Sequence, residues 1–212
     1  QTTGVSSINF LGNKKFRDRK LKGKLVTQES KWWKFFSSED SYDPDKLAYD
    51  REQLRKFYLD EGYADFQVIS AVAELTKDGS NFIITYVLDE GIEYEFGDAT
   101  IRSSLPNMDT DTLLPLIEHR KGNKYKATDI DSSIDNITFA VGEDGYASAD
   151  VRPRVKRNRE EAVIDIVYII EEGPRVYIET VNINQNTRTR DEVIRRELRV
   201  LEGDAYNLSL IH

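Results

Sequence analysis

A repeat of about 83 residues constrains the fold of this chain more than any other feature of its sequence. Gly62-Tyr63-Ala64 returns as Gly145-Tyr146-Ala147 after 83 residues, and Glu90-Gly91 returns as Glu172-Gly173 after 82. Self-similarity at a fixed period indicates a chain built from successive copies of one structural unit. The 212 residues therefore divide into two complete units and a shorter third.

Each complete unit contains a corner between a helix and a strand. In the first unit Leu54, Phe57 and Tyr58 lie three or four residues apart, so they share one face of a helix. Gly62 ends that helix, because the residue after a helix often takes a left-handed conformation that glycine adopts without strain. Tyr63 then folds back on the last helical turn, and a strand follows.

The elements around this corner predict the order β-α-α-β-β. Ser6–Leu11 is typical of a strand, and Asp43 followed by Pro44 is a strong start for the helix that ends at Gly62. Phe66–Leu75 and Phe82–Leu88 form a hairpin across a turn. We expect an α+β fold in which each unit has a three-stranded mixed sheet covered by two antiparallel helices.

The same order repeats along the chain, which predicts three domains at residues 1–91, 92–173 and 174–212. The third reaches only the beginning of its second helix at His212, so we expect the chain to be part of a longer protein.

Hydrophobic pattern distinguishes central strands from edge strands. Phe82–Leu88 and Ile164–Ile170 are apolar on both faces, which is typical of a central, covered strand. Ser148–Val155 alternates charged and apolar residues and contains Pro153, which favours a sheet edge. Phe66–Leu75 takes the equivalent edge position in the first unit, but it has no proline and a single charge.

An edge strand without protection is a template for a strand of another chain. We therefore predict that Phe66–Leu75 adds a strand from a client polypeptide, and the alternative is that a neighbouring unit or loop covers it. The candidate contact residues are the alternating positions Phe66, Val68, Ser70, Val72 and Glu74.

Composition and motifs argue against several other functions. The net charge of −8 makes a general nucleic-acid surface improbable, since such domains are usually basic. There is no cysteine, no apolar run near the roughly 20 residues of a membrane helix, and no glycine-rich phosphate loop. The histidines, His119 and His212, lack metal-ligand spacing, and we expect His119 at the surface near a helix end.

Carboxylates are abundant, but they do not indicate catalysis. Those that begin the helix before Gly62 complement its dipole, namely Asp43, Asp45, Asp50 and Glu52. The sequence therefore predicts neither an enzyme nor a cofactor or metal.

Several stretches resemble the periplasmic POTRA repeats of the Omp85 family. They are INFLGNKKF, the Trp32-Trp33 pair, LRKFYLDEGYADF, GYASADVRPRV and VIRRELRVLEGD. The resemblance extends over essentially the whole chain, in the order of the third, fourth and start of the fifth repeat of β-barrel assembly proteins. TamA and the two-partner-secretion transporters share the fold and are the alternative.

The resemblance implies a periplasmic region attached to a membrane barrel. In this family such repeats guide unfolded outer-membrane proteins, partly by β-augmentation at a hairpin edge, and scaffold accessory lipoproteins. It further implies that Glu197 contacts the lipoprotein BamD through an ion pair, with Arg196 a weaker candidate. From charge pattern alone, this run is simply a solvated helix face.

An aromatic cluster lies between the two predicted helices of the first unit. It is a candidate partner interface, because aromatic residues dominate interface energetics. The preferred interpretation is packing within the first unit or against its neighbour, since buried aromatics mostly build cores. Its members are Trp32, Trp33, Phe35 and Phe36.

Overall fold

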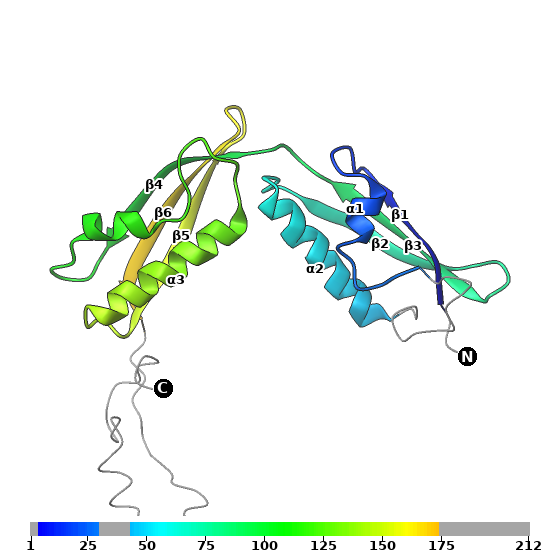
Figure 1. Ribbon diagram of the computed structural model, residues 1–212, viewed down its shortest axis with the longest axis horizontal. Coiled ribbons are helices and arrows are strands. Elements are labelled where there is room, and N and C mark those ends of the chain that lie inside the picture. The colour runs from blue at the N-terminus through cyan, green and yellow to red at the C-terminus, as the bar shows by residue number, and fades with distance from the viewer. Residues whose placement is uncertain (1–3, 30–42, 174–212) are drawn as a thin grey trace, which may run out of the picture. The chain divides into compact units, whose positions relative to one another are not determined.

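The computed structural model describes residues 4–29 and 43–173 (Figure 1). Within them the order β-α-α-β-β occurs twice, which confirms the predicted α+β fold. The first set is β1 (Gly4–Leu11), α1 (Asp18–Lys22), α2 (Pro44–Asp60), β2 (Gln67–Leu75) and β3 (Asn81–Asp89). The second set is β4 (Glu95–Ser103), the 3-10 helix η1 (Thr110–Leu116), α3 (Ala127–Glu143), β5 (Ala149–Asn158) and β6 (Val163–Glu172).

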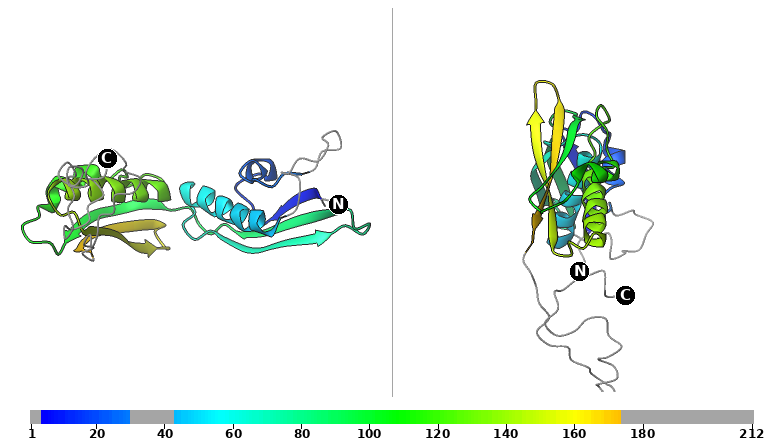
Figure 2. Two further views of the ribbon diagram at one scale, coloured as in Figure 1. Left: turned by 90° about the horizontal axis from the view of Figure 1, so that it is seen from below. Right: turned by 90° about the vertical axis from the view of Figure 1, so that its left-hand side faces the viewer.

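The first sheet has the strand order β1-β3-β2. β1 runs parallel to β3 and β2 antiparallel to it, so the sheet is mixed. The predicted central position of Phe82–Leu88 is confirmed, and β2 is an edge strand as expected. Helices α1 and α2 lie on one face of this sheet (Figure 2).

The second sheet has the order β4-β6-β5, with the predicted central strand again in the middle. Ile164, Ile166, Tyr168 and Ile170 of β6 are fully buried. The described chain forms two compact units. The first sheet lies in one unit, and most of the second sheet lies in the other, which includes residues 98–120, 129–155 and 166–173.

Helix α2 begins and ends as its sequence predicts. The Asp43 carboxylate accepts a hydrogen bond of 2.9 Å from the amide of Asp45, and Pro44 occupies the first turn. At the other end Gly62 has φ of +98°. The Tyr63 amide then donates to the Tyr58 carbonyl at 3.0 Å, which closes the last turn.

The corner of the second unit has the same construction. Gly145 has φ of +95°, and the Tyr146 amide donates to the Val141 carbonyl at 3.1 Å. The repeated Gly-Tyr-Ala sequence therefore encodes one helix stop used twice, since an L side chain at this φ is strained.

Buried carboxylates fix the loops of the first unit. Asp50 is fully buried and accepts hydrogen bonds from the Val26 and Thr27 amides at 2.6 and 3.1 Å. Its expected role in the helix dipole is therefore wrong: Asp50 lies beyond the first turn and holds the α1–α2 connection. Glu90 accepts from the Tyr58 hydroxyl at 2.9 Å and from the Lys15 amide.

Candidate functional site

The outer edge of β2 exposes apolar side chains beside a free row of backbone groups. β3 pairs with one side of β2, and no other strand in the described part of the chain pairs with it. Ile69, Val72 and Leu75 are 62%, 46% and 58% exposed. Within the described residues, the edge thus has the features that favour addition of a further strand.

The other edge of the same sheet, on β1, is closed by a side chain. The Ile8 amide donates to the Glu29 carboxylate at 2.9 Å, and the Lys22 ammonium donates to the same carboxylate at 2.6 Å. Burial alone raises the pKa of Glu29, but these hydrogen bonds outweigh it and hold the pKa below its ordinary value. An anionic acceptor therefore occupies a backbone donor that an incoming strand would need.

A β-bulge interrupts β2 near its beginning. Val68 pairs with Leu88, whereas Ser70 already pairs with Val87, so Ile69 is the extra residue. Residues directly opposite each other in a strand pair project to the same face of the sheet. The bulge therefore shifts the alternation of side chains along β2.

This shift divides the five predicted contact residues between two faces. Val68 packs against the core together with Ala71 and Ala73, and Phe66 lies buried just before the strand. Ser70, Val72 and Glu74 oppose Val87, Thr85 and Ile83 on the other face. The expectation of a single alternating face is wrong, because it assumed a strand of uninterrupted period two.

Sequence reasoning also missed Ile69 and Leu75, the two most exposed apolar residues of this edge. The signal was present in the sequence. The polar residues change parity along this stretch, from the odd position of Gln67 to the even positions of Ser70 and Glu74. Such a change of phase within one strand is typical of an inserted residue.

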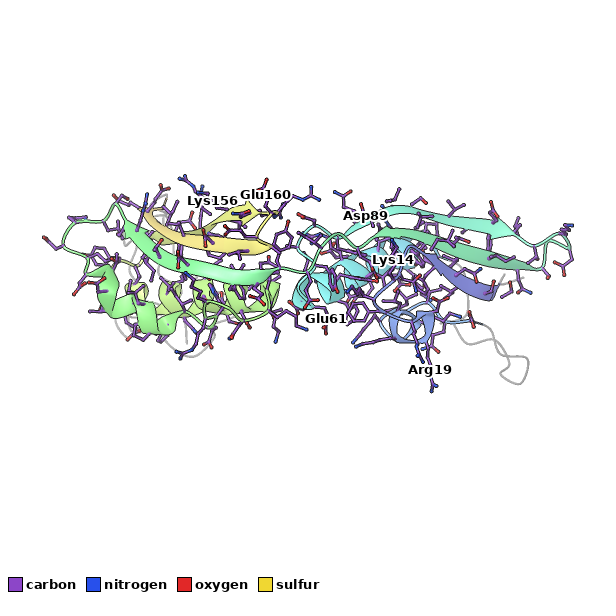
Figure 3. The ribbon with its side chains drawn as sticks, turned by 90° about the horizontal axis from the view of Figure 1, so that it is seen from above. Lys14, Arg19, Glu61, Asp89, Lys156 and Glu160 are labelled. Atoms are coloured by element: carbon purple, nitrogen blue, oxygen red, sulfur yellow. The ribbon has the colours of Figure 1, made fainter. Side chains whose placement is uncertain are left out.

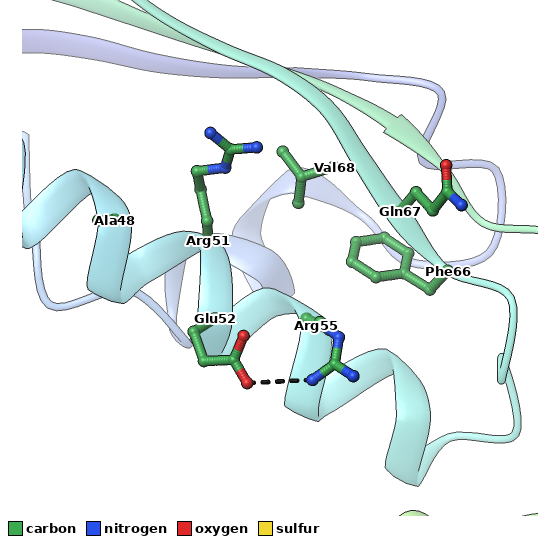
Figure 4. Close-up of a pocket in the computed structure, with 7 residues that line it drawn as sticks. All are labelled: Ala48, Arg51, Glu52, Arg55, Phe66, Gln67 and Val68. Carbon is green, nitrogen blue, oxygen red and sulfur yellow. Dashed lines mark hydrogen bonds and ion pairs between the residues drawn. The ribbon is translucent and has the colours of Figure 1, made fainter.

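A groove of about 510 Å³ lies between helix α2 and the beginning of β2 (Figure 4). Figure 4 shows Arg51 pointing from α2 toward Val68, while Arg55 forms an ion pair with Glu52 at 3.1 Å. The groove thus joins an apolar surface to cationic groups. Its lining residues are Ala48, Arg51, Glu52, Arg55, Phe66, Gln67 and Val68.

The equivalent edge strand of the second sheet, β5, has a different surface. Most of it is exposed, residues 151–159 contain no acidic residue, and Pro153 offers no backbone N–H. Arg152 pairs with Asp150 at 2.6 Å, and Arg154 and Lys156 are exposed. Lys156 projects away from the strand in Figure 3. Charge and proline are established means of blocking strand addition.

The repeated folding unit is found in a known protein family. The POTRA family, described as "Surface antigen variable number repeat", matches residues 3–91, 94–173 and 176–212. These matches extend over nearly the whole chain. The chain belongs to the POTRA family.

Relatives of this POTRA chain are outer-membrane protein assembly factors. BamA of Neisseria meningitidis serogroup B is 28% identical over 205 residues, which are 97% of this chain and 26% of that protein. BamA of Nitratidesulfovibrio vulgaris is 29% identical over 207 residues, 95% of this chain and 26% of that protein. The chain thus spans about a quarter of the length of these relatives.

A solved POTRA structure resembles the whole chain. The crystal structure of Haemophilus influenzae BamA POTRA3-5 is similar with a TM-score of 0.79 and 25% identity. The match extends over 100% of this chain and 82% of that one. The predicted resemblance to assembly-protein POTRA repeats is therefore confirmed.

His119 does not lie at the surface of the POTRA fold. It is buried, and its Nε2 is 2.7 Å from the Tyr168 hydroxyl, so the surface prediction is wrong. Burial lowers the pKa of His119. The buried His119 ring thus gives the hydroxyl of Tyr168, a fully buried residue of the central strand β6, a hydrogen-bond partner.

The remaining predicted site residues lie outside the described part of this POTRA chain. These are Glu197 and Arg196, together with Trp32, Trp33, Phe35 and Phe36. Within residues 4–29 and 43–173, no group of three or more acidic or histidine side chains is placed to hold a metal ion. In those same ranges, no helix combines the length and apolarity that crossing a membrane requires.

Proposed function

We propose that this chain is the periplasmic POTRA region of an outer-membrane β-barrel assembly protein, where it guides unfolded outer-membrane proteins without catalysis. The observation that carries the proposal is the outer edge of β2, which is apolar and has no paired strand among the described residues. The relatives named BamA support the same assignment to outer-membrane assembly.

Strand addition at β2 suits clients that share a β pattern and no common sequence. Backbone hydrogen bonds provide affinity that tolerates different sequences, and alternate side chains add mild selectivity. Because of the bulge, the proposed side-chain contacts fall on two faces of the sheet. Ser70, Val72 and Glu74 contact the client on the open face, and Val68 contacts it on the face toward α2.

The proposal further assigns three domains, at residues 1–91, 92–173 and 174–212, and a docking role for accessory lipoproteins. BamD would bind the third domain through Glu197, with a smaller contribution from Arg196. For Glu197→Lys we expect loss of lipoprotein capture in a pull-down, because the ion pair becomes a like-charge contact. Capture at the wild-type level would remove this part of the proposal.

Two other functions are distinguished by the β2 edge. A passive spacer between barrel and partners needs no open edge, and a TamA-like or two-partner-secretion transporter would recognise other clients. The decisive experiment is an NMR titration of the isotopically labelled chain with a peptide copied from an outer-membrane barrel strand. Amide shifts concentrated on Gln67–Leu75 are the expected result, with β5 as internal control.

The same titration can overturn the client site. If Gln67–Leu75 shows no shifts up to millimolar peptide, while the spectrum remains that of a folded protein, the edge does not bind clients. Function would then reside in spacing and in lipoprotein contacts. Binding of a two-partner-secretion substrate in place of barrel strands would instead favour the transporter alternative.

A further inference from the structure

The groove beside β2 carries a charge that strand addition alone does not require. An edge strand binds through its backbone, and an apolar groove floor would be enough to accommodate client side chains. Here Phe66 and Val68 form an apolar surface, and two arginines of α2 flank it. This arrangement combines an apolar contact with recognition of an anion.

The two arginines differ in how much of their charge is available. Arg55 is paired with Glu52, with 3.1 Å between guanidinium nitrogen and carboxylate oxygen. Arg51 has no ion-pair partner within the described residues, and its guanidinium points toward Val68 (Figure 4). Arg51 is therefore the cation that an incoming group would meet.

The register of β2 determines which client residue reaches Arg51. A client residue directly opposite Val68 would project to the same face as Val68, which is the face toward α2. That side chain enters the groove next to Arg51. Client residues opposite Ser70 and Val72 project to the other face, away from the arginines.

We propose, on the basis of the proposed strand addition, that Arg51 makes β2 selective for strands with an acidic side chain opposite Val68. Arg51 fixes the register of the client by binding that carboxylate, while the backbone of β2 provides the general affinity. A side-chain carboxylate is favoured over a terminal one, because a strand inside a long unfolded chain carries no terminal charge. Glutamate has the reach to enter the groove from the neighbouring strand position.

The negative net charge of the chain makes the expected preference for glutamate depend on where the glutamate stands in the client strand. At −8, the protein as a whole repels an acidic peptide. An added glutamate should therefore weaken binding at most strand positions and strengthen it at one. If glutamate strengthened binding at every position of the peptide, the cause would be something other than Arg51.

The test uses the complete 212-residue chain and labelled ten-residue strand peptides with blocked ends. One glutamate is moved along an alternating valine-threonine sequence, and each peptide is compared with its glutamine counterpart. At one position we expect the glutamate peptide to bind about two- to five-fold more tightly, the range of an exposed ion pair. This preference should decrease at high salt.

Variants of the two arginines identify the source of the preference. Arg51→Gln should make the glutamate and glutamine peptides bind equally, without lowering the thermal stability. Arg55→Gln is the matched control and should retain most of the preference, because Glu52 already neutralises Arg55. In Arg51→Glu, a lysine at the same peptide position should replace glutamate as the preferred residue.

Three outcomes overturn the inference, and they differ from failure of the proposed function. Equal binding of glutamate and glutamine peptides, with shifts on Gln67–Leu75, retains strand addition and removes the role of Arg51. If the preference for the glutamate peptide persists in Arg51→Gln, a group other than Arg51 binds the carboxylate. In a second peptide set that differs only in a free C-terminus, an Arg51-dependent gain confined to that set would show that Arg51 binds the terminal carboxylate of the chain. Absence of any shift on β2 refutes the proposed client site itself.

Discussion

The outer edges of β2 and β5 occupy the same position in two copies of one fold, but their surfaces are opposite. β2 carries exposed Ile69, Val72 and Leu75 and a single charge, Glu74. β5 carries a run of basic residues and Pro153. Fold alone therefore does not determine whether a POTRA edge binds a strand, and the side chains on that edge do.

Comparison of the edges on β1, β2 and β5 shows that the missing protection of β2 is the feature that needs an explanation. Lysine, arginine and proline on β5 are the usual protection of an edge against unwanted pairing. β1 is protected differently, by the Glu29 carboxylate on the Ile8 amide. Among the edges of β1, β2 and β5, β2 departs from this rule, and only its bulge moderates the exposure.

The largest effect is expected from proline at the β2 edge. Leu88 and Thr85, the partners of Val68 and Val72, lie three residues apart on β3, so their backbone groups point to opposite sides. One of Val68 and Val72 therefore directs its N–H outward, and the other directs it to β3. The outward-facing proline variant should lose more than about tenfold in peptide affinity at nearly unchanged stability.

The inward-facing proline variant is the matched control. It removes a hydrogen bond between β2 and β3 and should lower the free energy of unfolding by about 2 kcal/mol. Peptide affinity by fluorescence anisotropy and stability by urea unfolding separate the two variants. Full client binding in both would contradict strand addition at this edge.

The next effect tests whether β5 can acquire the property of β2. In the triple variant Pro153→Val, Arg154→Thr and Lys156→Thr, the edge gains an N–H donor and loses two charges. We expect strand peptides to produce amide shifts on β5, where the wild-type protein shows none. If the shifts remain confined to β2, then features other than edge protection distinguish the two strands.

A smaller effect is expected from one charge on each edge. Val72→Lys places an ammonium on the open face of β2 and should weaken peptide binding about three-fold, since edge lysines oppose pairing. Val155 is exposed on β5, so Val155→Lys is its counterpart and should leave binding unchanged. Equal loss in both variants would indicate a general charge effect.

The smallest effect concerns the protected edge of β1. The pKa of Glu29 is lowered, so its contribution to stability is complete at neutral pH and is lost as the pH falls below about 4.5, its ordinary value. Glu29→Gln should destabilise the fold by about 1 kcal/mol or less at pH 7, because the ion pair between Glu29 and Lys22 is partly exposed. The difference from wild type, measured by urea unfolding, should vanish at low pH. A constant difference would exclude the charge as its cause.

Local signals in the sequence predicted most of the fold. The Gly62 and Gly145 corners, the Asp43 helix start and the two central strands depend on neighbouring residues, and all are confirmed. The position of β2 at an edge followed from the repeat, because β5 carries Pro153 and the two strands are equivalent.

Features that depend on distant contacts were not predicted. Asp50 and His119 are polar residues whose burial is satisfied by Val26, Thr27 and Tyr168, far away in the sequence. No pattern in the neighbouring residues predicts partners that lie so far away in the sequence. The Ile69 bulge is an intermediate case: the change of parity between Gln67 and Ser70 marks it in the sequence, but uninterrupted alternation was assumed. The contacts proposed for Glu197 stay a prediction.

The extra residue at Ile69 also sets how long a bound strand stays and how far pairing can spread. Beyond the bulge, only residues 70–75 offer an uninterrupted ladder, and each hydrogen bond contributes about 1 kcal/mol. A contact of this length dissociates quickly, so a client is released for its next step. Growth of stacked sheets needs flat, regular edges, whereas a bulge twists the strand. We therefore expect this POTRA edge to turn clients over without seeding their aggregation.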